Sequence, residues 1–236
     1  MEYKLIHFNP RFRNIFFSLA LLVIVVSCNP DDEDFVSQPV DVAYVSIYHA
    51  APNAPALDIA VDGRLINRDP LEYTGYSGYL NFFTGTREIK FHSANANSAV
   101  IDTTFNFEDG KAYSLFAINT ASDVEALLVV DSAAAPAAGK AMVRFINLAP
   151  DAPAFDLTHG TDSVLFSGNY FKGATPFQEV VADTYSFQIR DAGASKALIT
   201  AEDVEILPGR FYTVITRGFL NPPNGNSNIL SLEVIE

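Results

Sequence analysis

The sequence predicts an all-β fold of two tandem antiparallel β-sandwich domains that follow a secretory signal. Three observations support this prediction. A 16-residue stretch occurs twice at an offset of 98 residues, and apolar residues recur with a period of two along most of the chain. An apolar N-terminal run also ends at a cysteine, as it does in exported proteins.

Residues 1–27 have the three-part layout of a signal peptide. Basic residues precede an apolar run over residues 15–26, and Ser27 and Cys28 follow it. The run is about a dozen residues long, whereas a membrane-spanning helix needs roughly twenty. Cys28 is the only cysteine and follows a small residue, so the junction resembles the lipobox of bacterial lipoproteins. The sequence therefore predicts cleavage before Cys28 and lipidation of this residue.

Residues 28–40 are predicted to form a lipidated acidic tether. Four consecutive carboxylates at residues 31–34 repel one another and stay hydrated. An acidic run directly after a lipidated cysteine also resembles the signal that sends lipoproteins of the Bacteroidetes group to the cell surface. We therefore expect an outer-membrane lipoprotein that is exposed at the cell surface, with a periplasm-facing orientation as the alternative.

The charge and the cysteine content exclude several classes of function. The formal net charge is −13 at pH 7, so the surface should repel nucleic acid and anionic lipid head groups. Association with the membrane is therefore expected through the N-terminal lipid. A single cysteine also excludes an intramolecular disulfide framework and any metal site built from several cysteines.

Internal repetition divides the rest of the chain into two domains. Residues 43–58 and 141–156 are identical at eight of 16 aligned positions, and both contain the pattern Ala-Pro-(Asn/Asp)-Ala-Pro-Ala-x-Asp. A stretch of small residues with one proline and one glycine separates the copies. We therefore predict a first β-sandwich over residues 41–132, a linker over residues 133–140 and a second β-sandwich over residues 141–236.

Each domain is expected to contain seven strands. Apolar and polar residues alternate within short runs, and Asp-Gly and similar turn dipeptides separate them. Such β-branched and aromatic runs favour an antiparallel sandwich of the immunoglobulin-like or transthyretin-like type. In the first domain the runs cover residues 42–49, 56–62, 76–83, 86–92, 99–106, 112–119 and 124–131.

The stretch HAAPNAPALDIAVDG, from His49 to Gly63, and the later Gly-Lys-Ala-Tyr ending at Tyr113 resemble the domain-of-unknown-function family 4397. The resemblance covers both copies, over about residues 42–131 and 141–236. In the second copy an asparagine replaces the histidine. The resemblance implies a β-sandwich module of secreted and envelope proteins, and it implies no catalytic residue.

No catalytic, metal or cofactor site is predicted. His49 could pair with Asp58 across the turn, but no nucleophile motif accompanies them and Asn147 stands at the equivalent position. Aspartates at strand ends recur singly and lack the spacing of a calcium loop. They are expected to accept hydrogen bonds from the backbone N–H groups of their own proline-containing turns instead.

The candidate ligand contacts lie where the two copies differ. Tyr76 is aromatic whereas its equivalent is Ala174. The aromatic positions Tyr73, Tyr79, Phe82 and Phe83 are apolar in both copies, which favours a core role for these four residues. Residues 218–228, GFLNPPNGNSN, form an insertion that the first copy lacks, and loops of this kind often hold recognition residues. Tyr76, Asn221 and Asn224 are therefore the predicted contacts, with a disordered polar loop as the alternative for the insertion.

The predicted function is that of a non-enzymatic, lipid-anchored envelope protein that acts as a binding, adhesion or scaffold module. The alternative is a carbohydrate-binding accessory lipoprotein at the cell surface, for which Tyr76 would offer a ring to a sugar. The expected partners are the membrane, through the lipid, and a glycan or an envelope protein.

Overall fold

The structure is a computed structural model that describes residues 40–236 except residues 95, 97, 132 and 161–162. Residues 40–236 form one compact unit. The predicted signal peptide, the lipidation site Cys28 and the acidic tether up to residue 39 lie outside the described residues. Within the described part of the chain, no helix has the length and apolar character needed to cross a membrane.

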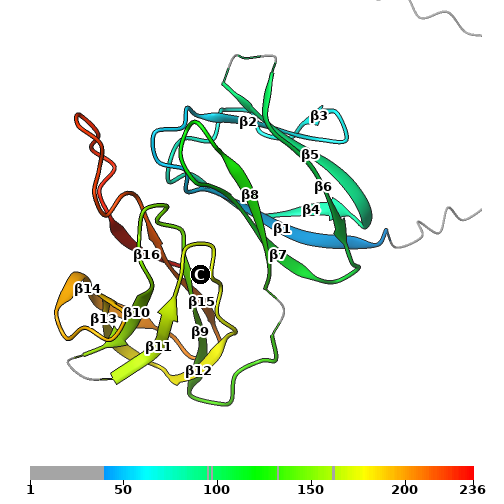
Figure 1. The fold of residues 1–236 in the computed structure, drawn as a ribbon. Coiled ribbons are helices and arrows are strands. Elements are labelled where there is room, and N and C mark those ends of the chain that lie inside the picture. Colours follow the sequence, from blue (N-terminus) through cyan, green and yellow to red (C-terminus); the bar gives the residue numbers. More distant parts are fainter. Residues whose placement is uncertain (1–39, 95, 97, 132, 161–162) are drawn as a thin grey trace, which may run out of the picture. The chain divides into compact units, whose positions relative to one another are not determined.

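The described residues form strands and no α-helix, which confirms the predicted all-β class (Figure 1). The first half contains β1 (Val42–His49), β2 (Leu57–Val61), β3 (Arg64–Leu65), β4 (Tyr76–Phe83), β5 (Gly85–Ser93), β6 (Ala99–Phe107), β7 (Ala112–Ile118) and β8 (Glu125–Val130). The second half contains β9 (Lys140–Asn147), β10 (Phe155–His159), β11 (Ser163–Asn169), β12 (Gln178–Val181), β13 (Asp183–Asp191), β14 (Ala197–Ile206), β15 (Phe211–Arg217) and β16 (Ser231–Ile235).

Each half is a sandwich of two four-stranded sheets. The sheets of the first half have the orders β4-β1-β7-β8 and β3-β2-β5-β6, and those of the second half β12-β9-β15-β16 and β11-β10-β13-β14. The two halves thus have the same strand order. One difference from the expected antiparallel sandwich is that β7 pairs with β1, and β15 with β9, in parallel. Each half also has eight strands among its described residues instead of the predicted seven. The additional strands are β3, whose two residues are too few to show a period, and its seven-residue equivalent β11.

The core of each half lies between its two sheets. Alternate residues of β1, which are Ala43, Val45 and Ile47, are buried in the core of the first half. Full burial of a large apolar side chain such as valine or isoleucine contributes about 1.5–3 kcal/mol to the stability of the fold. The equivalent residues of β9, which are Ala141, Val143 and Phe145, lie in a separate core of the second half. The period of two in the sequence therefore marks the residues that face these cores.

Part of the outward face of β1 and of β7 is buried as well, because residues of both strands belong to a third apolar cluster with residues of β9 and β15. In this cluster Tyr48 pairs with Phe116 across β1 and β7. Ile146 pairs with Ile215 at the equivalent positions of β9 and β15. Each half thus contributes the same surface to the contact, which is the arrangement found in twofold dimers.

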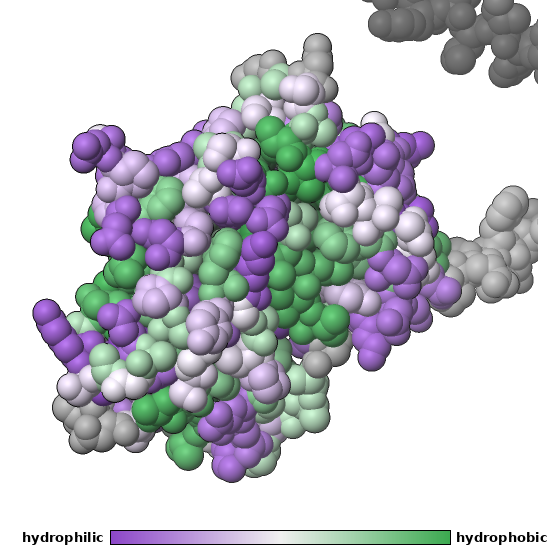
Figure 2. Space-filling model, in the orientation of Figure 1, coloured by the Kyte–Doolittle hydropathy of each residue, from purple (hydrophilic) through white to green (hydrophobic). Residues whose placement is uncertain are grey.

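The solvent-exposed surface retains apolar side chains among its polar ones. Figure 2 shows hydrophilic residues over much of the face that it draws, with a continuous hydrophobic area near the centre. The large apolar or aromatic side chains that stay exposed include Tyr79, Phe83 and Tyr170. The predicted core role is therefore wrong for Tyr79 and Phe83, which lie on edge strand β4, whereas Phe82 is buried as predicted. Exposed apolar surface of this kind is a common feature of binding sites.

Candidate functional site

A cleft of about 350 Å³ opens where the two halves meet, and the predicted contact Tyr76 lies in it. Aromatic rings and polar side chains line its walls. The aromatic residues are Tyr76, Tyr79, Phe116, Phe177 and Phe211, and the polar ones are Ser46, Ser114, Asp131, Arg144, Thr213 and Glu236. This volume falls in the range of small-molecule pockets, which is roughly 300–1,000 Å³.

The start of β4 places Tyr76 in the cleft. The hydroxyl of the next residue, Ser77, accepts a hydrogen bond from the Ile47 backbone N–H at 2.8 Å. The pairing of β1 with β4 is irregular just before Tyr48, so Tyr48 lies opposite Tyr76 with the two ring centroids 6.3 Å apart. An irregularity of this kind redirects side chains. The Tyr76 side chain, which is 39% exposed, is therefore supported by another ring and open to solvent.

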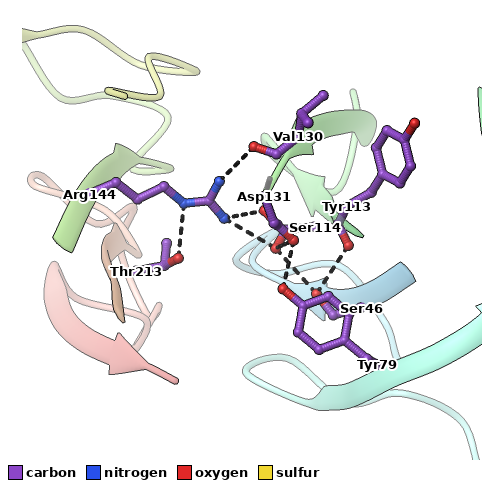
Figure 3. Close-up of polar contacts among 8 residues, drawn as sticks. All are labelled: Ser46, Tyr79, Tyr113, Ser114, Val130, Asp131, Arg144 and Thr213. Atoms are coloured by element: carbon purple, nitrogen blue, oxygen red, sulfur yellow. Dashed lines mark hydrogen bonds and ion pairs between the residues drawn. The ribbon is translucent and has the colours of Figure 1, made fainter. Parts of the chain in front are cut away.

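Arg144 lies at the centre of the polar network in the cleft (Figure 3). Its Nε donates to Thr213 Oγ1 at 2.9 Å, and its Nη1 donates to the Val130 carbonyl oxygen at 3.1 Å. Its Nη2 lies 2.5 Å from Asp131 Oδ1 and donates to Ser114 Oγ at 3.3 Å. Because Thr213 belongs to the second half and Ser114 to the first, this one guanidinium group connects the two sandwiches.

Asp131 completes the network from the first half. Its Oδ2 accepts hydrogen bonds from the Tyr79 hydroxyl at 2.7 Å and from Ser114 Oγ at 2.8 Å. Asp131 and Arg144 are both buried. A buried ion pair is tolerated when the remaining hydrogen-bonding positions of both groups are satisfied. The network therefore stabilises the contact between the halves and holds the Tyr79 ring in the wall of the cleft.

The tyrosines of the cleft remain neutral at physiological pH. Burial raises the pKa of Tyr79, and the negative charge of Asp131 raises it further. Burial also raises the pKa of Tyr76. The Arg144 guanidinium carbon lies 4.6 Å from the centroid of the Phe177 ring, a cation–π distance. The cleft therefore presents rings and neutral hydroxyl groups, and the described residues that line it include no activated nucleophile.

The other two predicted contacts, Asn221 and Asn224, do not line this cleft. The backbone N–H groups of Asn221 and of the residue before it donate to the two carboxylate oxygens of Asp151 at 2.7 and 2.8 Å. Asn226 donates a side-chain hydrogen bond to Asn53. Asp151 and Asn53 occupy equivalent positions of the two Ala-Pro patterns. The 218–228 insertion is therefore held against these two turns, and Asn224 is exposed on it.

His49, which was considered as a catalytic base, hydrogen-bonds to the backbone of the turn that follows it. Its Nε2 lies 3.1 Å from the Pro55 carbonyl oxygen, and its Nδ1 accepts a hydrogen bond from the Ala51 N–H at 3.3 Å. Burial lowers the pKa of the imidazole. Both ring nitrogens are thus used by backbone groups, which leaves neither for the pairing with Asp58 that the sequence suggested.

The strand-end aspartates were expected to accept hydrogen bonds from the backbone of their own proline-containing turns, but Asp156 accepts its bonds from other segments. Its two carboxylate oxygens accept from the N–H groups of Gly168 and Gly193 at 2.8 and 2.9 Å. Among the residues that the structure describes, no three side chains of His, Cys, Asp or Glu come together in a way that could hold a metal ion.

Sequence reasoning missed Arg144 and Asp131. A signal for Arg144 was present, because it interrupts an apolar stretch in the middle of β9, and a charged residue inside a buried strand needs a partner. Asp131 directly follows β8 and resembles any polar residue at a strand end. Their approach depends on how the two halves pack, which no local spacing indicates.

Several solved structures were similar to this chain at low scores. The Bacillus anthracis TIE protein is 12% identical with a TM-score of 0.26, and the match covers 75% of this chain and 34% of that chain. The family CBM26 module CBMbc of Eubacterium rectale Amy13K, solved with maltoheptaose, is 8% identical with a TM-score of 0.24 over 82% of this chain and 97% of that one. A candidate adhesin from Bacteroides ovatus is 10% identical with a TM-score of 0.22 over 89% and 96%. The chain thus spans about a third of the Bacillus anthracis protein.

No curated protein matches the chain. A protein-family model does match it. The model is described as Domain of unknown function (DUF4397), and the match runs from residue 43 in β1 to residue 158 in β10. The matched segment contains both copies of the Ala-Pro pattern, at residues 51–58 and 149–156. Over residues 43–158 the chain therefore belongs to the DUF4397 domain family, which confirms the resemblance for the first copy; the resemblance over residues 159–236 of the second copy lies outside this match.

Proposed function

We propose that the protein is a non-enzymatic binding module of the cell envelope, held at the outer membrane by a lipid on Cys28. The observation behind the proposed binding role is the aromatic cleft that contains Tyr76 and Tyr79. Its charged side chains are used within the protein, since Arg144 pairs with Asp131 and Glu236 pairs with Arg210. Its tyrosine hydroxyls stay protonated. A cleft of this composition is suited to hold a ligand rather than to transform one.

A pair of tyrosine variants tests the binding role. Tyr76→Ala removes an exposed ring from the cleft, whereas Tyr170→Ala removes a ring that is 70% exposed and lies outside the cleft. We expect Tyr76→Ala to weaken binding of any ligand found by at least about tenfold, because a ring stacked on a ligand contributes roughly 1 kcal/mol beyond its burial. Tyr170→Ala should leave binding unchanged. Equal effects of the two variants would place the ligand elsewhere.

The non-enzymatic part of the proposal has its own test. Residues 40–236 are incubated with generic ester, peptide and glycoside substrates, and release of product is followed. We expect no turnover above the uncatalysed rate. Turnover that disappears in a His49→Asn or Tyr76→Phe variant with an intact fold would show that the protein is an enzyme.

A carbohydrate ligand is the second candidate, and the exposure of Tyr76 and Tyr79 favours it. These side chains are 39% and 48% exposed, and the apolar face of a sugar ring packs against aromatic rings of this kind. The test is a glycan array probed with residues 40–236, followed by chemical-shift mapping of each glycan that binds. Shifts at Tyr76 and Tyr79 would support the idea. An array without binding, or shifts confined to the 218–228 insertion, would contradict it.

The lipid anchor and the surface location are tested in cells. Cys28→Ser should move the protein from the membrane fraction to the soluble fraction, because a covalent lipid contributes about 0.8 kcal/mol per buried CH₂ group. Protease added to intact cells should degrade the wild-type protein if it faces outward. Protection until the outer membrane is opened would indicate the periplasm-facing alternative.

A further inference from the structure

The first half contains a second hollow, a groove of about 620 Å³ that lies apart from the cleft between the halves. It opens between β3 and β4, which are the edge strands of the two sheets of the first sandwich. Val61, Leu80 and Phe82 supply apolar surface to it, and Phe82 belongs to the core of this half. The groove therefore exposes part of the sandwich interior along one open side.

The second half shows what closes this side of the fold. There the edge strand β11 is seven residues long, and its Phe166 lies opposite Leu157 and packs against the core. In the first half the edge strand β3 has only two residues. By the strand register, Ile66 lies opposite Ile59 in the first half, where Phe166 lies opposite Leu157 in the second. The Ile66 N–H donates to the Ile59 carbonyl oxygen at 2.9 Å, and its side chain lines the groove and stays 37% exposed. The next residue, Asn67, turns its side chain onto β2, where Oδ1 accepts the Ile59 N–H at 2.7 Å. The shorter strand and the smaller, exposed Ile66 therefore close this side of the first half less completely than β11 closes the second.

The backbone of β4 has free hydrogen-bonding groups along this groove. The backbone N–H of Tyr44 on β1 donates to the carbonyl oxygen of Lys111, which directly precedes β7. The N–H and C=O of Tyr44 therefore point toward β7 and away from β4. Hydrogen-bonded and non-hydrogen-bonded pairs alternate along an antiparallel ladder. Leu80 and Phe82, which lie opposite Val45 and Ala43, are therefore the β4 residues whose backbone hydrogen-bonds to β1. Asn81, opposite Tyr44, directs its N–H and C=O outward. An edge of this kind is a template for an added strand.

The charge at the groove differs in sign from that of the whole chain. Asp62 forms an ion pair with Arg87 at 3.0 Å, so these two charges offset each other. Arg64 is exposed and has no ion pair among the residues that the structure describes. The three ionisable residues of the lining therefore have a net charge of about +1, whereas the full chain has −13. This difference favours a ligand with a carboxylate near Arg64.

We propose that the groove between β3 and β4 binds an extended acidic peptide, which pairs with the outer edge of β4 and places alternate apolar side chains on Val61, Leu80 and Phe82. The backbone of Asn81 supplies the pairing, the groove accepts the side chains, and Arg64 interacts with the carboxylate of the peptide. This interaction surface lies outside the proposed ligand cleft and adds a polypeptide partner to the functions considered above.

The test uses two synthetic peptides and the full chain in detergent micelles. Both peptides have valine at alternate positions with threonine between, and the ends are aspartate in one and lysine in the other. Binding is measured by fluorescence polarisation, and amide hydrogen exchange locates the site. We expect the aspartate peptide to bind at least about tenfold more tightly than the lysine peptide. It should slow exchange of the Asn81 amide.

Three variants separate the contributions. Asn81→Pro removes the outward N–H and should weaken binding by about tenfold or more, while Asn81→Ser keeps it and should bind as the wild type does. Arg64→Glu, an exposed substitution that should leave the fold unchanged, is expected to reverse the preference between the two peptides. The Arg64→Glu variant tests the proposed peptide site even if Asn81→Pro does not fold. The proposal is overturned if neither peptide binds, if Arg64→Glu leaves the preference unaltered, or if protection appears outside β4.

Discussion

His49 and Asn147 differ in chemistry but make the same two hydrogen bonds at equivalent positions of the two halves. Each accepts a bond from the backbone N–H two residues ahead, at 3.3 Å for His49 and 3.1 Å for Asn147. Each also meets the carbonyl oxygen of the proline six residues ahead, at 3.1 and 3.5 Å respectively. These partners require an imidazole with its proton on Nε2 and a free lone pair on Nδ1. The Ala-Pro pattern is therefore a turn built twice, and its histidine has a structural role.

Stability at mildly acidic pH should depend on His49. Burial lowers its pKa below the ordinary value of 6.5, so the unfolded chain binds a proton at a higher pH than the folded chain does. The contribution of the neutral imidazole is therefore complete above about pH 6.5 and declines as the pH falls below it. The decline should reach at most about 1.4 kcal/mol per pH unit. Urea unfolding of residues 40–236 at several pH values between 5 and 8 measures this decline in the free energy of unfolding.

The His49→Asn variant should fold, because asparagine occupies the equivalent position in the second half. Its free energy of unfolding should no longer decline between pH 6.5 and 5. His92→Asn, which removes a histidine outside the turn, is the composition control and should keep the wild-type profile. A His49→Asn variant with an unchanged profile would show that another group titrates.

The fold could be predicted from patterns within single strands, because these patterns show which residues face the core of their own sandwich. Alternation in β1 marks Ala43, Val45 and Ile47 as core residues because burial in a sheet has a period of two. The opposite face of the same strand contains Ser46 and Tyr48, and their burial comes from packing against the second half. That packing joins surfaces far apart in sequence, so alternation alone identifies one buried face and not the other.

The prediction of the site was partial for the same reason. Comparison of the two copies drew attention to Tyr76, which the structure places in the cleft, because a residue that differs between repeats is not required by the fold. It could not indicate Asp131, whose position in the cleft depends on its contact with Arg144. It also could not indicate that Asn221 and Asn224, which are both exposed, lie outside this cleft.

Gly75 and Gly173 should be intolerant of any side chain. A Cβ atom on Gly75 would lie 2.7 Å from the Glu72 carbonyl oxygen, and one on Gly173 would lie 2.7 Å from the Tyr170 carbonyl oxygen. These contacts are with backbone, which cannot move aside as a side chain does. We expect Gly75→Ala and Gly173→Ala each to lower the free energy of unfolding by about 1–3 kcal/mol, as measured by urea unfolding.

A third glycine separates crowding from backbone conformation. Gly139 has a positive φ of +77°, and a Cβ atom added there would have no non-neighbouring atom within 4 Å. Gly139→Ala therefore tests the conformational cost without a clash. The expected loss is about 1–2 kcal/mol from the left-handed conformation. Tolerance of alanine at both Gly75 and Gly173 would mean that the turn opens more easily than the contacts indicate.

Removal of one partner of the Arg144–Asp131 ion pair should cost more than removal of both. Arg144→Leu leaves Asp131 buried without its counter-charge and should lower the free energy of unfolding by about 3–5 kcal/mol. The double variant Arg144→Leu with Asp131→Leu removes both charges and should regain part of this loss. A double-mutant cycle by urea unfolding measures the coupling. Additive effects would show that the two residues act independently.

Asp151 should hold the 218–228 insertion in place. Its carboxylate accepts the backbone N–H groups of Leu220 and Asn221 at 2.8 and 2.7 Å, and hydrogen bonds to a charged group are worth about 1.5–3 kcal/mol. Asp151→Ala should therefore speed amide exchange at these two residues by roughly tenfold or more and expose the insertion to proteases. Asn53→Gly, which removes the contact with Asn226 and keeps the positive φ of +68° at this position without strain, is the matched control and should change exchange less. If the two variants behaved alike, the insertion would be held by its contact with the first half rather than by the carboxylate of the second.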